Sequence, residues 1–471
     1  MRRGAGGDRK APCRARRRVP SCEKGEMMMK IALIGQDIPT LLPTLLTDLL
    51  FVGKQSAEVA LEEKNAAMQE VLQRYGEAVI RDAQTRTPDL QATITVTGSR
   101  REVLEDADCV IYAGDCMAAS RFKMDREALS GVEEDDPGLT EQARVNGGIG
   151  GLLHTLRQGE MVLDLCESMQ DYCPDAVVIN LGQPVARTTR MFVNAGFRCY
   201  GLGRTPLRGA NGLDSLVKKL SCKLDDVHAT IAGLPGFSFL LGLGDVNTED
   251  DLLPLLVDIA EEEELGRLTR RWYDWYNAIA IGDVTDHAEW LPAQDDYIPE
   301  AEPEFGEGVE RRKERILWMN AVGMKGAKEK EGQMAQLLLL SKAPPIRPMQ
   351  LALAVLTGAD CDIPAVTRVN NGELPQLAKS AIIEAELTQR GGEIIPHGTM
   401  LPLPLMEICG EIDETNRLAA LAATGDRSAL RECVEVDPAL AGLDRLYVQD
   451  VVDKMIGLHS DVLSRFDDEE Y

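Results

Sequence analysis

The residues with the clearest chemical potential form a short cluster around position 288. His287 and Glu289 lie within three residues of Trp290, in the segment HAEWLP. A histidine or a carboxylate can act as a general base when its pKa lies near neutrality. Either residue could therefore be catalytic. A lone histidine is more often a packed core residue, and this alternative stays open.

A second set of polar residues follows the first predicted strand. This strand, KIALIG, ends at Gly35 and precedes the apolar helix PTLLPTLLTDLL. Strand, tight turn and helix open a dinucleotide-binding unit, in which phosphate binds at the N–H groups of the helix end. Gln36 and Asp37 occupy positions where small residues normally let the backbone approach a pyrophosphate, and Asp37 adds negative charge. As an alternative, Asp37 caps the helix and the turn serves packing.

Acidic residues follow the next predicted strand, Ser56–Leu61. This strand ends at Glu62 and Glu63. An acidic side chain a little over 20 residues after the glycine turn usually binds ribose hydroxyls. We therefore predict that the turn Gly35–Asp37 and Glu63 contact a dinucleotide cofactor.

Strands and helices alternate through the first half of the chain. Further strands are predicted at 92–97, 107–112 and 176–180, with helices at 65–89 and 151–172. This alternation predicts an α/β fold with a Rossmann-type doubly wound parallel sheet. The second half combines helical periodicity at 249–280 and 308–340, short strands near 381–387 and 394–396, and helices to the end.

The predicted organisation has four parts. We expect a disordered basic leader over 1–28, a Rossmann NAD-binding domain over 29–220, a C-terminal α/β domain over 221–462 and an acidic tail over 463–471. A length of 471 residues suits two tightly joined domains. The leader lacks the apolar region of a signal peptide.

Composition excludes several classes of function. The net charge of −26 disfavours nucleic acid and anionic membranes as partners. No apolar run reaches the roughly 18 residues that a bilayer span needs. The eleven cysteines show no CxxC pair or zinc spacing, which indicates free thiols in a reducing cytoplasm.

Several segments together carry a resemblance to a known family. In chain order they are KIALIG, GGIGGLLHTLRQGEMVLDLCESMQDYCPDAVVIN, YGLGRTP, AGLPGF, EWLP and VNNGELPQLAKSAIIEAE. Their order and spacing resemble those of the NAD-dependent family 4 glycoside hydrolases, and the second half is most similar to the α-galactosidase and α-galacturonidase branch. The resemblance implies a Rossmann domain related to lactate and malate dehydrogenases and an α/β C-terminal domain.

The resemblance also implies an unusual redox mechanism. In the family, NAD takes a hydride from the sugar, a tyrosine removes a neighbouring proton, and manganese or another divalent metal stabilises the anion. The metal-ligand cysteine and histidine fall here on Gly203 and Gly236, which have no side-chain donor, so we predict no metal site. The tyrosine falls on Trp290, which we expect to stack on a sugar face.

Three further residues are predicted to contact the substrate. Gln183 replaces the asparagine of the family's Asn-Pro dipeptide and keeps an amide; a simple turn after a strand is equally consistent with it. Arg204 and Arg208 could neutralise an oxyanion or bind the carboxylate of an acidic sugar. Alternatively, both are surface arginines.

Two functions stay open at this point. The first is a glycoside hydrolase-like protein of carbohydrate metabolism that cleaves O-glycosyl bonds by the NAD-dependent route in an altered, metal-poor site, with His287 or Glu289 as the base. The second is a catalytically silent homologue that binds a sugar or assembles with partners. The expected partner is a small-molecule sugar or glycoside, and the resemblance implies a homo-oligomer, either a dimer or a tetramer.

Overall fold

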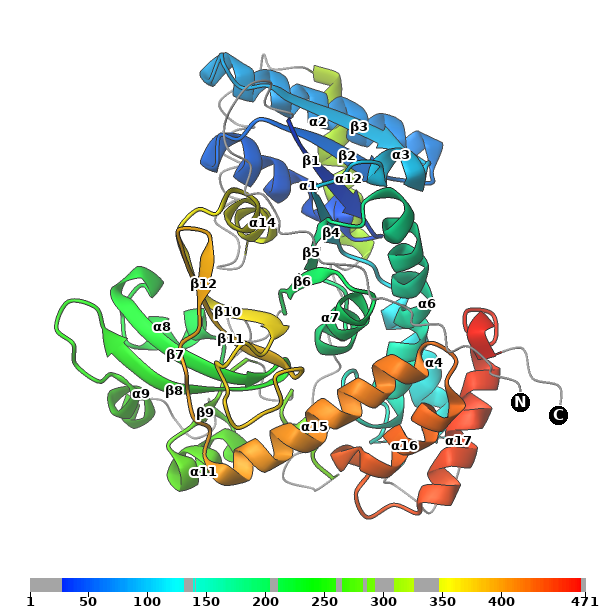
Figure 1. Cartoon of the computed structure of the whole chain (residues 1–471), viewed down its shortest axis with the longest axis vertical. Helices are drawn as coiled ribbons and strands as arrows, with labels where there is room; N and C mark the ends of the chain where they lie inside the picture. Colours follow the sequence, from blue (N-terminus) through cyan, green and yellow to red (C-terminus); the bar gives the residue numbers. More distant parts are fainter. Residues whose placement is uncertain are drawn as a thin grey trace, which may run out of the picture.

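Figure 1 shows the computed structural model of the chain. It describes residues 28–130, 139, 141–203, 211–259, 265–282, 286–292, 309–325 and 347–466. The predicted leader lies almost wholly outside these residues, and so do the last five residues of the predicted acidic tail.

Six parallel strands form the first half of the sheet, in the order β3-β2-β1-β4-β5-β6. Their bounds are β1 Met29–Ile34, β2 Ala57–Glu62, β3 Ala92–Thr97, β4 Cys109–Tyr112, β5 Val177–Asn180 and β6 Arg198–Gly201. The strand order reverses between β1 and β4, so the carboxyl ends of these two strands open a crevice at a topological switch point. The predicted Rossmann-type doubly wound parallel sheet is confirmed.

Helices connect these strands. They are α1 Ile38–Thr47, which continues as a π-helix over Asp48–Val52, α2 Ala66–Arg86, α3 Arg100–Leu104, α4 Ala118–Ser130, α6 Gly148–Tyr172 and α7 Val185–Asn194. The start of α2 has a local cause: the Asn65 side chain accepts hydrogen bonds from the N–H groups of Ala67 and Met68, which the helix itself leaves unpaired.

The second half of the sheet is antiparallel and continues from β6 in the order β10-β11-β7-β8-β9. Its strands are β7 Val227–Leu234, β8 Phe237–Asp245, β9 Ile279–Ala280, β10 Cys361–Val369 and β11 Ile382–Arg390, and β12 Glu393–Ile395 pairs with β11. The strands predicted near 381–387 and 394–396 are confirmed. The β7–β8 hairpin was not predicted, and it places Gly236 in a tight turn.

The predicted helical stretch 249–280 is divided. Within it the structure has α9 Leu253–Ile259 and α11 Arg267–Tyr276. Asn277 adopts a left-handed conformation that ends α11, after which the chain enters β9. The prediction of helix over 249–280 was therefore wrong at its C-terminal end, where residues 279–280 form a strand.

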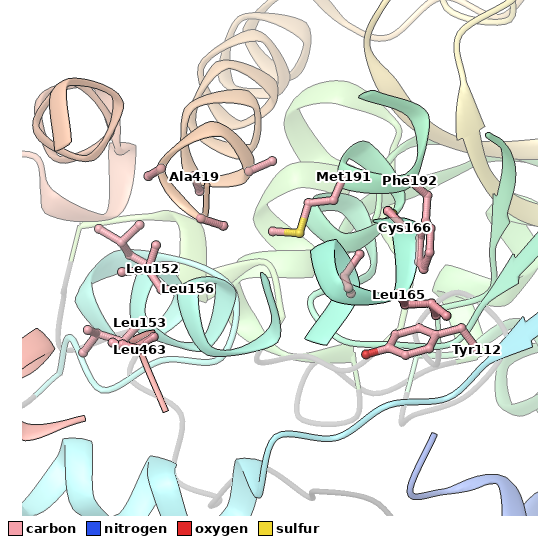
Figure 2. Close-up of a cluster of buried hydrophobic side chains, with 14 of the residues drawn as sticks. Tyr112, Leu152, Leu153, Leu156, Leu165, Cys166, Met191, Phe192, Ala419 and Leu463 are labelled. Carbon is pink, nitrogen blue, oxygen red and sulfur yellow. The ribbon is translucent and has the colours of Figure 1, made fainter. Parts of the chain in front are cut away.

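Several helices from the second half of the chain pack against the parallel part of the sheet and its connecting helices. These are α12 Val309–Lys325, α14 Pro348–Thr357, α15 Leu403–Ala422, α16 Arg427–Val436 and α17 Arg445–Leu458, with the short α8 Leu213–Lys219 beside β7. Figure 2 shows Leu152 and Leu156 of α6 on the side of Ala419 of α15, and Leu153 beside Leu463, in one buried cluster. Residues from both sides of position 220 pack together in this one core. The predicted domain boundary at 220 therefore does not separate two independent hydrophobic cores.

A buried ionic network fixes the end of α17. His459 Nε2 lies 2.5 Å from Asp125 Oδ1 on α4, and Arg157 of α6 donates to both oxygens of the same carboxylate, at 3.2 and 2.8 Å. Arg121 Nη1 lies 3.2 Å from His459 Nδ1. Since a guanidinium only donates, Nδ1 accepts and the Nε2–H group donates to Asp125. All four side chains are buried.

The structure also bears on the predicted free cysteines and on the predicted lack of a membrane span. The nine cysteines within the described ranges are free. In the same ranges, no helix combines the length and hydropathy required to cross a membrane.

Candidate functional site

The crevice between β1 and β4 is narrow at the turn that follows β1. Gly35 has a φ of +128°, and a Cβ there would lie 2.2 Å from the carbonyl carbon of Ala113, directly after β4. The Asp37 N–H donates to Ala113 O at 3.1 Å, and the Asp115 N–H donates to Gln36 Oε1 at 3.0 Å. Hydrogen bonds therefore join the turn after β1 to the turn after β4.

The first turn of α1 has little left to offer an anion. Ile38 N–H donates to Gly35 O at 3.2 Å, Thr40 N–H donates to Asp37 O at 3.0 Å, and Pro39 has no N–H group. The Asp37 side chain makes no capping hydrogen bond, so the predicted alternative of a side-chain cap is wrong. In this conformation the turn does not fit a pyrophosphate in the usual way.

The acidic residues after β2 also have local partners. Glu62 lies 2.7 Å from Lys64 Nζ and 3.1 Å from Arg100 Nε. Glu63 Oε1 accepts a hydrogen bond from the Asn65 N–H at 2.8 Å. Glu63 nevertheless lies half-buried at the carboxyl end of β2, the position at which ribose hydroxyls are usually bound.

A second region lies where the N-terminus of α6 packs against the 3₁₀ helix Ala288–Trp290. The Glu289 carboxylate accepts hydrogen bonds from the backbone N–H of Val145 and Asn146 and from Asn146 Nδ2, at 3.3, 2.7 and 2.9 Å. Burial raises the pKa of Glu289, and these hydrogen bonds oppose the rise. Because its oxygens are engaged in holding this loop, the geometry favours a structural role for Glu289 over the predicted catalytic role.

His287 is buried among aromatic rings. Its ring centroid lies 5.1 to 5.6 Å from those of Phe237, Phe239 and Trp272. Nε2 lies 2.8 Å from the carbonyl oxygen of Ser238, and burial lowers the pKa of the imidazole to about 4. A neutral, enclosed imidazole favours the core-residue alternative over the predicted base.

Two buried donors on neighbouring side chains have no hydrogen-bond partner within the described part of the chain: Trp290 Nε1 and Arg187 Nη2. Trp290 Nε1 and Asn146 Nδ2 each lie 3.8 Å from the position that a Cβ of Gly236 would take. The Arg187 guanidinium carbon lies 5.5 Å from the Trp290 ring centroid, over the ring. Arg187 is fully buried, and Trp290 is 1% exposed.

The rest of Arg187 is fixed by neighbouring helices. Its Nη1 donates to Gly151 O and Thr155 Oγ1 of α6, both at 2.7 Å, and its Nε donates to Asn416 Oδ1 of α15 at 2.7 Å. The guanidinium is therefore held rigidly while one nitrogen stays unused. Since one face of Trp290 lies under Arg187, the tryptophan offers its N–H group more readily than the predicted stacking face.

A buried carboxyl group lies in the sheet between the predicted metal-ligand positions. Gly201, Thr367, Glu384 and Gly233 pair in one row across β6, β10, β11 and β7. Ser238 Oγ donates to Glu384 Oε2 at 3.0 Å. Burial raises the pKa of Glu384 to about 8, so the group holds a proton at neutral pH.

Replacing Glu384 by glutamine should change how stability depends on pH. An unfolded glutamate titrates near 4.3. Between that value and the folded value near 8, the Glu384 carboxyl is protonated in the native state and ionised in the unfolded state. The free energy of unfolding of the wild type therefore falls with rising pH, by at most about 1.4 kcal/mol per pH unit. The Gln variant lacks this loss, and its stability relative to wild type should increase between pH 5 and 8. Urea unfolding across this range measures the difference, and a constant difference would contradict the burial argument.

The donor set does not fit a divalent metal in the family's manner. Gly203 and Gly236 supply no side chain, and the structured residues contain no group of three His, Cys, Asp or Glu side chains placed to hold a metal ion. Gly236 also has a φ of +78°, a conformation that strains any other residue. We therefore derive no step through a metal.

The remaining predicted contacts are placed as follows. Gln183 is half-buried in the turn between β5 and α7, and a cis peptide bond joins it to Pro184. Arg204 and Arg208 lie outside the described residues. Sequence reasoning missed Arg187 and Asn146. The only available signal for Arg187 was a charged residue four positions after Gln183 in a strongly amphipathic helix.

One family and two proteins of known name are similar in sequence to parts of this chain. The family described as family 4 glycosyl hydrolase matches residues 30–204. An alpha-glucosidase of Erwinia rhapontici is 32% identical over 162 residues, which cover 32% of this chain and 33% of that protein, so the match spans about a third of that relative. The "Probable 6-phospho-beta-glucosidase" of Bacillus subtilis (strain 168) is 24% identical over 401 residues, covering 79% of this chain and 84% of that protein.

Solved structures of similar fold cover nearly the whole chain. A 6-phospho-alpha-glucosidase from gut microorganisms, in complex with NAD and Mn²⁺, has a TM-score of 0.71 at 14% identity and covers 93% of this chain and 99% of its own. A 6-phospho-beta glucosidase from Thermotoga maritima, with NAD and glucose-6-phosphate, has a TM-score of 0.67 at 15% identity, with coverages of 93% and 99%. At these identities the likeness establishes the fold.

Proposed function

We propose that this chain, whose residues 30–204 match family 4 of the glycosyl hydrolases, is a glycoside hydrolase-like protein of carbohydrate metabolism with an altered, metal-poor site. Its ligand is a small-molecule sugar or glycoside, bound beside Gly236 between the first turns of α6 and α7. The observation that carries this proposal is the pair of buried, unpaired donors, Trp290 Nε1 and Arg187 Nη2.

The energetic argument starts from the cost of these two donors. A buried polar group without a partner destabilises a protein by about 1–3 kcal/mol, and buried donors are therefore nearly always paired. Two such groups side by side, one of them charged, are explained by a ligand rich in oxygen atoms. Sugar hydroxyl and ring oxygens accept hydrogen bonds from both, and Asn146 Nδ2 lies near enough to orient them. Gln183, in the turn before α7, is proposed as a further contact.

For cleavage of an O-glycosyl bond, the proposal gives positive charge to Arg187. A guanidinium stays protonated at neutral pH, so it can stabilise negative charge on a substrate oxygen without a metal. The rigid contacts of Arg187 with α6 and α15 preorganise this charge. The identity of the base stays open, because the contacts of His287 and Glu289 do not favour either.

For the cofactor we propose NAD, which supplies a hydride acceptor when bound. The crevice between β1 and β4 fits it by position in the fold, with Gly35 in the turn and Glu63 at the end of β2. The N–H groups of Asp37, Ile38 and Thr40 do not fit it as they stand, since each already donates to a backbone oxygen.

A second candidate function is a catalytically silent sugar-binding homologue. The specific observation in its favour is that the carboxylate of Glu289 and the imidazole Nε2 of His287 are both held by backbone contacts. The two candidates share the sugar site and differ in turnover, so binding and hydrolysis must be measured separately. The homo-oligomer and the cytoplasmic location stay predictions, which size-exclusion chromatography with light scattering and cell fractionation would check.

Trp290→Phe tests the sugar site with little change in shape. The variant keeps an aromatic ring and removes the N–H group, so affinity for the sugar should fall about 3- to 10-fold, the value of one net hydrogen bond. Calorimetric titration with galactose, glucose and their uronic acids measures the change. Trp275→Phe is the matched control, because Trp275 is 63% exposed and lies on α11. Equal affinities of both variants and wild type would reject the assigned donor.

A further inference from the structure

We propose that Gln36 occupies the phosphate position of the dinucleotide crevice and thereby sets the affinity for NAD. This inference rests on the proposed cofactor and on no assumption about the sugar. It follows from three contacts that Gln36 makes with elements far apart in the sequence.

Gln36 joins four elements at the mouth of the crevice. It follows β1, and its side-chain Oε1 accepts a hydrogen bond from the Asp115 N–H, after β4, at 3.0 Å. Its backbone oxygen accepts a hydrogen bond from Arg312 Nη2 of α12 at 2.7 Å. Its Nε2 lies 4.0 Å from the Met161 sulfur of α6. One residue therefore spans the opening between β1 and β4.

The two donors to Gln36 are of the kinds that bind phosphate. Backbone N–H groups at strand-end turns and guanidinium groups are the usual partners of phosphate oxygens. Here both donate to oxygens of the same glutamine instead. Gln36 Oε1 and Gln36 O thus take the place of two phosphate oxygens, and the residue acts as an internal substitute for the anion.

The N–H groups that follow Gln36 in the turn are already hydrogen-bonded within the protein. The first-turn N–H groups of α1 bond to Gly35 O and Asp37 O, and Gly35 packs directly on Ala113. A dinucleotide must therefore displace the Gln36 side chain before its phosphates reach the Asp115 N–H. The energy of that displacement is subtracted from binding, so affinity is lower than an open crevice of this fold would give.

Calorimetric titration of the full chain with NAD tests the inference. Gln36→Ala removes Oε1 and frees the Asp115 N–H, and it should bind NAD about 3- to 10-fold more tightly than wild type, the value of one net hydrogen bond. Gln36→Glu keeps an acceptor for Asp115 but adds negative charge beside the phosphates, and it should bind more weakly than wild type. Gln449→Ala is the control, because Gln449 is a half-buried residue of α17, outside the crevice between β1 and β4, that bonds to Glu435.

A second substitution tests whether the gain comes from the side chain of residue 36 alone. Arg312 donates to the backbone oxygen of residue 36, which alanine retains, so Arg312→Ala in the Gln36→Ala background should leave most of the gained affinity in place. Sugar binding, measured on the same samples, should stay unchanged in all of these variants and shows that each one is folded. Wild-type and Gln36→Ala affinities that are equal, or a loss of affinity in Gln36→Ala, would overturn the inference. If none of the variants binds NAD while the sugar still binds, the cofactor proposal fails and the inference fails with it. Loss of sugar binding alone would refute only the sugar site.

Discussion

Replacement of Arg187 by methionine is expected to lower sugar affinity roughly 10- to 150-fold, because a hydrogen bond from a charged group contributes about 1.5–3 kcal/mol. The effect should exceed that of Trp290→Phe, which removes a neutral donor. Arg187→Lys keeps the charge, but its single nitrogen cannot contact α6 and Asn416 of α15 as Nη1 and Nε of arginine do, so its affinity should be intermediate. Calorimetric titration with the sugars named above measures all three variants.

A matched control for Arg187 lies on the same helix. Arg190 is also buried in α7, but its guanidinium donates to Ser380 O and to the Asp413 carboxylate. Arg190→Met should destabilise the fold while leaving sugar affinity within about twofold of wild type at a temperature where both are folded. If Arg187→Met and Arg190→Met changed affinity equally, Arg187 would have only a structural role.

Asp125→Ala should cause a large loss of stability. The substitution leaves the Arg157 guanidinium buried without its carboxylate, and it removes the acceptor of the His459 Nε2–H group. Breaking a buried ion pair by removing one member typically costs about 3–5 kcal/mol. Urea unfolding of the variant and wild type measures the difference in the free energy of unfolding.

The control for Asp125 is an exposed ion pair. Glu77 and Arg81 lie 3.6 Å apart on the surface of α2. Glu77→Ala should change stability by less than about 0.5 kcal/mol, the usual value for such a helical pair. An Asp125→Ala effect as small as that of Glu77→Ala would show that the network does not anchor the C-terminal helix.

The architecture of the first half could be predicted from sequence because its signals are local. Each buried strand and each amphipathic helix has its own periodicity, and alternating strands and helices leave few topologies. The β7–β8 hairpin was missed because the segment AGLPGF was interpreted as the position of a lost metal ligand. The same Pro-Gly pair is a turn signal between two apolar runs, and it supported the hairpin equally well.

The candidate site was harder to predict because its contacts are distant in sequence. Arg187 bonds to residues 32, 36 and 229 positions away. No local pattern distinguishes such an arginine from one on the surface. His287 is the converse case: its proximity to Glu289 in sequence indicated catalysis, while the aromatic residues that enclose it come from β8 and α11, far away in sequence.

The glycine turn was predicted to contact the cofactor, although Gln36 and Asp37 occupy positions where small residues normally let the backbone approach a pyrophosphate. In the structure Gln36 accepts hydrogen bonds from Asp115 and Arg312. The alternative role of Asp37 as a side-chain cap was wrong, because its side chain makes no capping hydrogen bond.

The measurement that tests the account most directly is a comparison of aryl glycoside binding and hydrolysis with EDTA and with added Mn²⁺. Aryl glycosides of galactose, glucose and their uronic acids serve as ligands for wild type and Arg187→Met. We predict sugar binding that depends on Arg187 and changes less than twofold between EDTA and Mn²⁺. Binding or turnover that requires Mn²⁺, and that survives the loss of Arg187, would contradict a metal-poor site organised by this arginine.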